Sequence, residues 1–94
     1  MDEFIGTIKQ FAFMFETQGW MICHGQTIGI AQYQALFALL GTQFGGDGQT
    51  NFKLPDLRKK DAGGQYLRQG DLLPDGTPYI ESYICVQGIF PPRQ

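Results

Sequence analysis

Glycine is the residue that most limits how this chain folds, because it interrupts the sequence from one end to the other. It occupies 13 of the 94 positions, about double its usual share of roughly 7%. Glycine weakens the interiors of helices and strands and favours turns. We therefore expect many turns and few long helices, and the sequence does not fit an all-helical bundle.

The remaining composition is that of a small folded protein with few charges. Aromatic residues make up 14% of the chain and charged residues only 17%, with a formal net charge of −2. This content excludes intrinsic disorder, and the charge argues against nucleic acid as the main partner. No apolar run reaches the roughly 18 residues of a membrane span, so no membrane insertion is expected. A chain of this length forms one domain at most, here residues 1–94.

Alternating apolar residues predict strands in both halves of the chain. The first runs from Phe4 to Phe15 and is apolar on both faces at its end, which indicates cover from two sides. The second, Trp20 to Cys23, is expected to return as Gln26 to Ile28 through a two-residue hairpin loop, His24-Gly25, in which both residues need a positive φ. A short strand around Phe52 and Leu54 follows later.

The second half of the chain combines a long irregular region with one more strand. Residues 58–78 are punctuated by Gly63-Gly64, Gly70-Asp71 and Pro74-Asp75-Gly76, which predicts loops. Tyr79 to Phe90 reads as the last strand. Together with the earlier strands and one helix, this predicts a β-rich α+β fold.

The helix is expected over residues 30–40. Its apolar side chains recur at helical spacing and form one stripe, which is typical of a helix packed on a core. The stripe consists of Ile30, Tyr33, Leu36, Phe37 and Leu40. Gly41 stands where a glycine in the left-handed conformation ends a helix.

The residues that suggest chemistry are explained more simply by structure. Cys23 and Cys85 lie in apolar runs, so buried free thiols are favoured over a bridge, which stays open. Cys23 and His24 are neighbours in a strand and point to opposite faces, which argues against a nucleophile and base pair. Gly45 to Gly48 reads as a turn because it lacks the Lys-Ser/Thr pair of a P-loop. One histidine and scattered carboxylates do not have the spacing of metal ligands within one chain. A symmetric oligomer would repeat His24 around its axis and could gather ligands in that way. No catalytic residue, metal or cofactor is expected.

Several segments together resemble the phage tail collar domain, in the form also found in the microcystin-dependent protein family. The segments are Phe4-Ile5-Gly6, Gly19-Trp20, Cys23-His24-Gly25-Gln26, the helix with Gly41, Phe44-Gly45-Gly46-Asp47-Gly48, Phe52-Lys53-Leu54-Pro55-Asp56-Leu57-Arg58 and Gln87-Gly88-Ile89-Phe90-Pro91. The family usually continues after the segment ending in Arg58 with a long variable region, which is shortened here to about twenty residues.

The resemblance implies a structural role rather than an enzyme. Such domains occur in tail fibres and related particles, usually as intertwined homotrimers, so the expected partner is the chain itself, as a trimer or filament, with other tail-like particle proteins as further partners. A small chain with this much aromatic surface also favours burial between subunits. The candidate self-association residues are Phe11, Phe13, Phe15, Trp20 and Tyr79.

The alternative function is a receptor- or glycan-binding adhesin of a tail fibre, acting through its loops. The candidate ligand contacts are Asp47, Arg58 and Tyr66. The acidic start Met1-Asp2-Glu3 does not fit a secretory signal. We therefore expect synthesis in the cytoplasm without a signal peptide, and a final place in a virion, a tail-like particle or an extracellular fibre.

Overall fold

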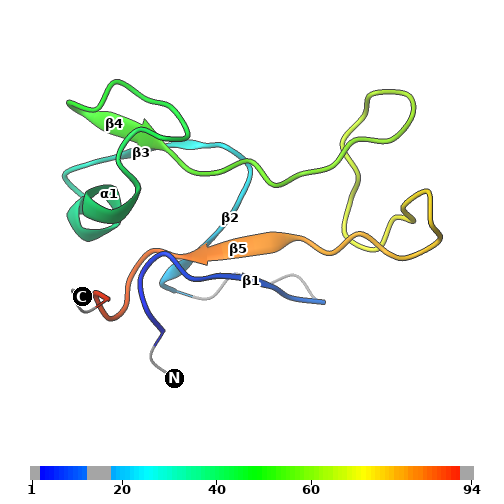
Figure 1. The fold of residues 1–94 in the computed structure, drawn as a ribbon, viewed down its shortest axis with the longest axis horizontal. Helices are drawn as coiled ribbons and strands as arrows, with labels where there is room; N and C mark the ends of the chain where they lie inside the picture. Colours follow the sequence, from blue (N-terminus) through cyan, green and yellow to red (C-terminus); the bar gives the residue numbers. More distant parts are fainter. Residues whose placement is uncertain (1–2, 13–17, 92–94) are drawn as a thin grey trace.

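The protein folds into two small antiparallel sheets beside one short helix, which confirms the predicted α+β class (Figure 1). The computed structural model describes residues 3–12 and 18–91. The strands are ordered β1-β5-β2 in the first sheet and β3-β4 in the second. The elements are β1 (Ile8–Gln10), β2 (Trp20–Ile22), β3 (Thr27–Gly29), α1 (Gln34–Leu40), β4 (Asn51–Lys53) and β5 (Ser82–Cys85).

The core joins the helix to both sheets. Leu36 of α1, Phe52 of β4 and Ile84 of β5 are each 0% exposed and belong to one apolar cluster. The predicted stripe is confirmed, because the other four residues of the stripe pack against this cluster. The ring of Phe37 lies 5.3 Å from that of Phe52, which fixes α1 against the second sheet.

The helix is shorter than predicted because its first turn is still tied to a strand. The backbone N–H of Ile30 donates to the carbonyl of Thr50, which continues the pairing of β3 with β4. Regular helix begins at Gln34, and the preceding Tyr33 offers no side-chain cap. Gly41 ends α1 with φ 57° as expected, but its ψ of −141° lies outside the left-handed helical region.

The first predicted strand is also shorter in the described residues. Gly6 has φ +91° and turns the chain just before β1, so the regular pairing with β5 covers only the three residues of β1. Gly6 and Thr7 add backbone hydrogen bonds to Cys85. Phe13 and Phe15 lie outside the described residues. Phe11 follows β1, and its ring packs edge-on against Trp20 at 5.6 Å and Tyr83 at 5.7 Å.

The predicted hairpin at His24-Gly25 is wrong. β2 pairs with β5 and β3 pairs with β4, and His24 does not adopt a positive φ. The side chain of Gln26 bridges the bend after β2, since its amide donates to the carbonyl of Ile22 at 2.8 Å and accepts from the His24 N–H at 3.1 Å. A two-residue hairpin would pair the backbone groups of Cys23 and Gln26, but these bond elsewhere. The Cys23 N–H donates to Ser82, its carbonyl accepts from Leu57, and the Gln26 carbonyl accepts from Leu54.

The last strand is confirmed in its centre only. β5 contains four buried residues between β1 and β2, whereas Ile89 is 46% exposed and forms an isolated parallel bridge with Phe4.

Cys23 and Cys85 are buried free thiols. The Cys23 N–H bonds to Ser82, three residues before Cys85. Three strand residues span about 10 Å, and a disulfide needs Cα atoms within about 7 Å.

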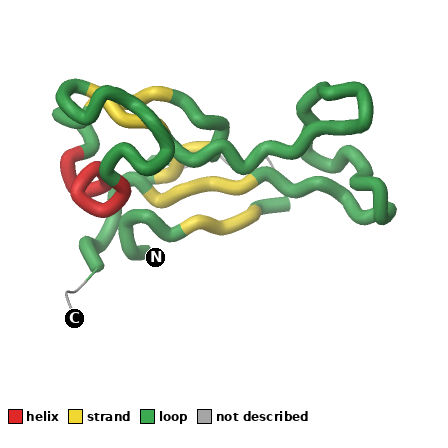
Figure 2. The backbone as a smooth tube through the Cα atoms, turned by 45° about the horizontal axis from the view of Figure 1, so that its top comes forward, coloured by secondary structure: helices red, strands yellow, loops and turns green. Residues whose placement is uncertain are grey.

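Residues 58–78 form an arm that extends away from the sheets, as both views show (Figures 1 and 2). The arm consists of two loops closed by single bridges, Lys60 to Tyr66 and Leu72 to Pro78. The loops are held by Asp61 and Asp75, whose carboxylates accept nearby backbone N–H groups. The predicted loop-rich character is therefore correct. The radius of gyration is 14.5 Å, compared with about 12 Å for a globular chain of this length.

Candidate functional site

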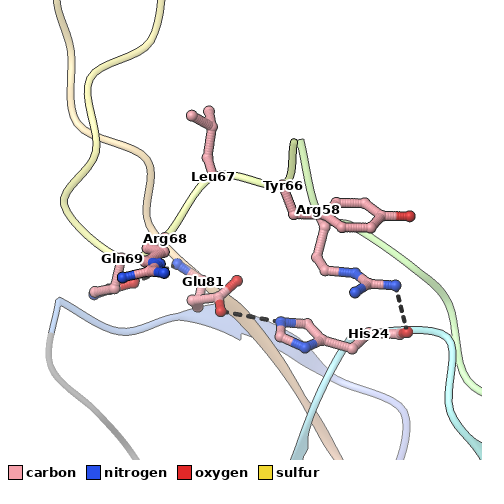
Figure 3. Close-up of a pocket in the computed structure, with 7 residues that line it drawn as sticks. All are labelled: His24, Arg58, Tyr66, Leu67, Arg68, Gln69 and Glu81. Atoms are coloured by element: carbon pink, nitrogen blue, oxygen red, sulfur yellow. Dashed lines mark hydrogen bonds and ion pairs between the residues drawn. The ribbon is translucent and has the colours of Figure 1, made fainter. Parts of the chain in front are cut away.

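A pocket of about 610 Å³ lies at the base of the arm, beside the end of β2 and the start of β5 (Figure 3). We call it the arm-base pocket. It is lined by His24, Arg58, Tyr66, Leu67, Arg68, Gln69 and Glu81. Its volume falls within the range of about 300–1,000 Å³ that is usual for ligand sites.

The register between β2 and β5 brings two polar side chains of the pocket, His24 and Glu81, together. Ile22 is paired with Tyr83, so the next residues on the same face of this antiparallel pair are His24 and Glu81. The Nε2 atom of His24 lies 3.0 Å from Glu81 Oε2. Because an ionised carboxylate only accepts hydrogen bonds, the imidazole N–H donates here.

Glu81 is the buried centre of a polar network. Its side chain is only 10% exposed, and its second oxygen accepts a hydrogen bond of 2.5 Å from the hydroxyl of Tyr79. Burial and this hydrogen bond raise the pKa of Tyr79 far above its usual value, so the phenol stays protonated as the donor. The amide of Gln69 accepts from the Glu81 N–H at 2.7 Å and donates to the carbonyl of Phe11 at 2.8 Å. The network therefore ties the arm to the first sheet.

Arg58 clamps the opposite side of the pocket. Its guanidinium donates to both carboxylate oxygens of Asp56, at 2.9 and 2.7 Å, and to the carbonyl of His24 at 3.0 Å. The hydrogen bond from Arg58 lowers the pKa of Asp56 from 3.8 to about 2. The guanidinium also lies 3.8 Å from the centroid of the Tyr66 ring, and Lys60 Nζ lies 4.9 Å from the same centroid.

We expect this clamp to weaken in acid. Asp56 has a folded pKa below its ordinary value of 3.8, so its stabilising contribution is complete above that value and is lost as the pH falls through about 2. Because the side chain is 38% exposed, Asp56→Asn should cost only up to about 1 kcal/mol near neutral pH. In urea unfolding, the difference between the midpoint concentrations of the wild type and Asp56→Asn should become smaller as the pH falls from about 4 to about 2.5. A difference in midpoint that grows in acid would contradict a stabilising ion pair between Arg58 and Asp56.

Two of the three predicted ligand contacts meet in this pocket. Arg58 and Tyr66 both line it, whereas Asp47 is not among its lining residues. The Oδ1 atom of Asp47 accepts the N–H groups of Gln49, Thr50 and Asn51, and these bonds hold its pKa well below the usual range. Asp47 thus organises its own glycine-rich turn, and its role as a ligand contact stays a prediction.

The predicted self-association residues have different surroundings. Tyr79 is only 4% exposed and is hydrogen-bonded to Glu81, so it is covered within its own chain, and its role in self-association stays a prediction. Phe11 and Trp20 are half-buried, and the Phe11 ring packs against the rings of Trp20 and Tyr83. Phe13 and Phe15 lie outside the described residues.

Sequence reasoning missed the polar centre of the pocket. His24 was assigned to a hairpin and Glu81 to no site, because the two residues are 57 positions apart and only the pairing of β2 with β5 joins them. The thiol of Cys23 is not part of any such site, since burial first, and then Asp56 and Glu81, raise its pKa to about 12. A thiol in this state is not a nucleophile at neutral pH.

Comparison of the sequence with protein families identifies the family of this chain. The chain matches the phage tail collar domain over residues 6–62, which is more than half of its 94 residues. The chain belongs to the phage tail collar domain family. The match includes His24 and Arg58, whereas residues 66–69 and Glu81, which complete the pocket, lie beyond it.

The collar domain is also similar to Protein RhiB of Rhizobium leguminosarum bv. viciae. The two are 42% identical over 57 residues, which cover 52% of this chain and 26% of RhiB. This collar protein therefore spans about a quarter of the length of that relative. No solved structure matches the chain significantly.

Membership of the family assigns a structural role of the phage-tail fibre type, associated with virions or tails. Among residues 3–12 and 18–91 of this collar protein, no helix is long and apolar enough to cross a lipid bilayer. The same residues contain no group of three or more His, Cys, Asp or Glu side chains arranged to hold a metal ion.

Proposed function

We propose that this collar domain is a non-enzymatic structural protein that assembles with copies of itself into a subunit or tip of a phage-tail-like fibre or filament. Other proteins of the tail-like particle are further partners in this proposal. The form of the family shared with microcystin-dependent proteins stays a prediction.

The edge strand β1 is the observation that supports self-association most directly. β1 lies at the end of the strand order β1-β5-β2, and its three residues are exposed. Within the described residues it pairs with β5 on one side only. An open edge of this kind is a ready site for pairing with another chain.

Exposed apolar side chains continue from β1 toward the end of the molecule opposite the arm. Ile8 of β1 is 43% exposed, and Phe4, which bridges to Ile89, is 48% exposed. Leu39 of α1 is 37% exposed, and a Cβ built on Gly6 would lie 3.7 Å from its side chain. A second copy that covers this surface would gain about 25 cal/mol for each Å² of apolar area removed from water.

Charge and shape are compatible with this assembly. A net charge of −2 gives little repulsion between copies. Residues 59–78 of the arm are exposed except for Leu67, Gln69 and Leu73, which are half-buried. Leu72 is 67% exposed, so the arm presents an apolar side chain that a neighbouring copy would cover. We propose a threefold building block, and contacts that do not close would extend it into a filament.

Sedimentation velocity tests the proposal. At micromolar concentration the wild type should sediment as a trimer or larger assembly rather than as the 10.5 kDa chain. Ile8→Asp should release monomers with unchanged circular dichroism, because a buried unpaired charge opposes the interface. Gln43→Asp adds the same charge at an exposed turn away from β1 and should leave the assembly intact. A folded wild-type monomer would refute self-association.

The second candidate function is the receptor- or glycan-binding adhesin. The arm-base pocket favours it, because Arg58 and Tyr66 line this pocket together with a buried carboxylate, Glu81. Binding of the labelled chain to a panel of immobilised glycans tests it. Binding that survives Ile8→Asp would separate recognition from self-association, and binding to no glycan would reject this function.

A further inference from the structure

We infer that the arm-base pocket binds a saccharide unit that carries one carboxylate group. The inference rests on the second candidate function and names the class of ligand for that site. It is independent of self-association, since no residue of the pocket lies in β1.

The pocket holds one unpaired cation. Arg58 is neutralised by Asp56, and His24 and Glu81 are bonded to each other. Arg68 is exposed, and among the described residues its guanidinium makes no hydrogen bond or ion pair. Guanidinium and carboxylate groups form strong bidentate pairs. A ligand with a single carboxylate therefore matches the charge that the pocket leaves free.

The base of the pocket suits hydroxyl groups. The two oxygens of Glu81 each accept one hydrogen bond, from Tyr79 and from His24, and each retains another lone pair. In Figure 3, His24 and Glu81 lie at the base of the pocket, while Arg58 and Tyr66 lie on one side of it and Arg68 and Gln69 on the other. A polyol can donate hydroxyl protons to the carboxylate while its own acid group meets Arg68.

The apolar part of the lining limits how the ligand sits. Leu67 is half-buried and offers an aliphatic surface to the C–H groups of a sugar ring. The Tyr66 ring carries Arg58 over it at 3.8 Å, so that face of the ring is not free to stack on a sugar. A purely apolar ligand does not fit, because it would cover Glu81 without offering a donor. A multiply charged phosphate does not fit either, since one free cation faces a buried anion.

The experiment is an NMR titration of the full chain labelled with nitrogen-15. D-glucuronate is the probe, D-glucose is its uncharged counterpart, and acetate supplies the carboxylate alone. We expect saturable chemical-shift changes of the amides of residues 66–69 and Glu81 with glucuronate. Glucose and acetate should bind at least tenfold more weakly, which corresponds to a difference in binding free energy of about 1.4 kcal/mol or more. Arg68→Gln should reduce the affinity for glucuronate to that for glucose. The exposed Lys59→Gln is outside the pocket and should change nothing.

Every other result of the titration would contradict a particular part of the inference. Equal binding of acetate and glucuronate would reduce the pocket to an anion site and overturn the inference. Equal binding of glucose and glucuronate, unaffected by Arg68→Gln, would overturn the carboxylate requirement and leave glycan binding standing. No shift with glucuronate, while the chain binds another glycan on the panel, would overturn the inference alone. No binding to any glycan would overturn the second candidate function as well.

Discussion

Leu36→Ala is expected to lower the free energy of unfolding by about 2–5 kcal/mol, because it leaves a cavity in a packed core. Leu36 is 0% exposed and belongs to the cluster that joins α1 to both sheets. α1 has only seven residues, and a helix this short depends on tertiary packing for its stability. Since small domains are stable by only about 5–15 kcal/mol, the variant should unfold at a much lower urea concentration.

Leu39→Ala is the matched control, because it makes the same change on the same helix. Leu39 is 37% exposed within its own chain, and truncation there should cost clearly less than Leu36→Ala, since it leaves no closed cavity. Equal urea midpoints for the two variants would show that Leu36 does not occupy the core position described above.

Gly46→Ala is expected to be about as damaging, by about 2–5 kcal/mol. Gly46 has φ +99°, and a Cβ at this position would run into the backbone of Phe52 in β4. The left-handed conformation costs a residue with a side chain about 1–2 kcal/mol, and overpacking adds about 1–3 kcal/mol. Urea unfolding measures the loss, and a backbone neighbour leaves little room for relaxation.

Gly64→Ala separates the two contributions. Gly64 also has a positive φ, +84°, but a Cβ there would meet nothing within 4 Å. This variant should lose only the conformational cost of about 1–2 kcal/mol. If Gly46→Ala and Gly64→Ala lose the same stability, the close approach of Gly46 to β4 would be contradicted.

Local patterns predicted the parts of the fold that depend on neighbouring residues. The stripe residues that lie on α1, namely Leu36, Phe37 and Leu40, were predicted correctly because a helix face repeats at fixed spacing and must be buried. The short strand around Phe52 was correct for the same reason, since alternation places apolar residues on one side. The loops of the arm followed from glycine, proline and the Asx turns that Asp61 and Asp75 form.

Long-range pairing was the part that local patterns did not contain. The hairpin prediction failed because the backbone groups of Cys23 and Gln26 bond to distant residues instead of to each other, and such pairing has no periodic signature. The loss of that hairpin allowed β2 to pair with β5 and placed His24 opposite Glu81. Arg58 and Tyr66 are predicted as ligand contacts from their chemistry and their place in loops, whereas their meeting in one pocket depends on how the arm folds back.

Tyr79 illustrates the same limit for a single residue. Its aromatic character suggested an exposed surface for a partner, yet its hydroxyl finds a carboxylate acceptor within the same chain. Burial of a tyrosine depends on such an acceptor, and here the acceptor is held in place by Gln69 and His24 as well. No pattern near Tyr79 in the sequence reveals those distant partners.

The position of β5 gives the molecule a mechanical property. β5 lies between β1 and β2, and it leads directly from the arm into the body of the protein (Figure 1). A pull on the arm along β5 would act parallel to both neighbouring strands, so the hydrogen bonds on its two sides would bear the load together in shear. Bonds loaded in this way must break together, whereas bonds peeled from one end break in turn. The central strand therefore makes the junction of arm and body suited to carrying tension.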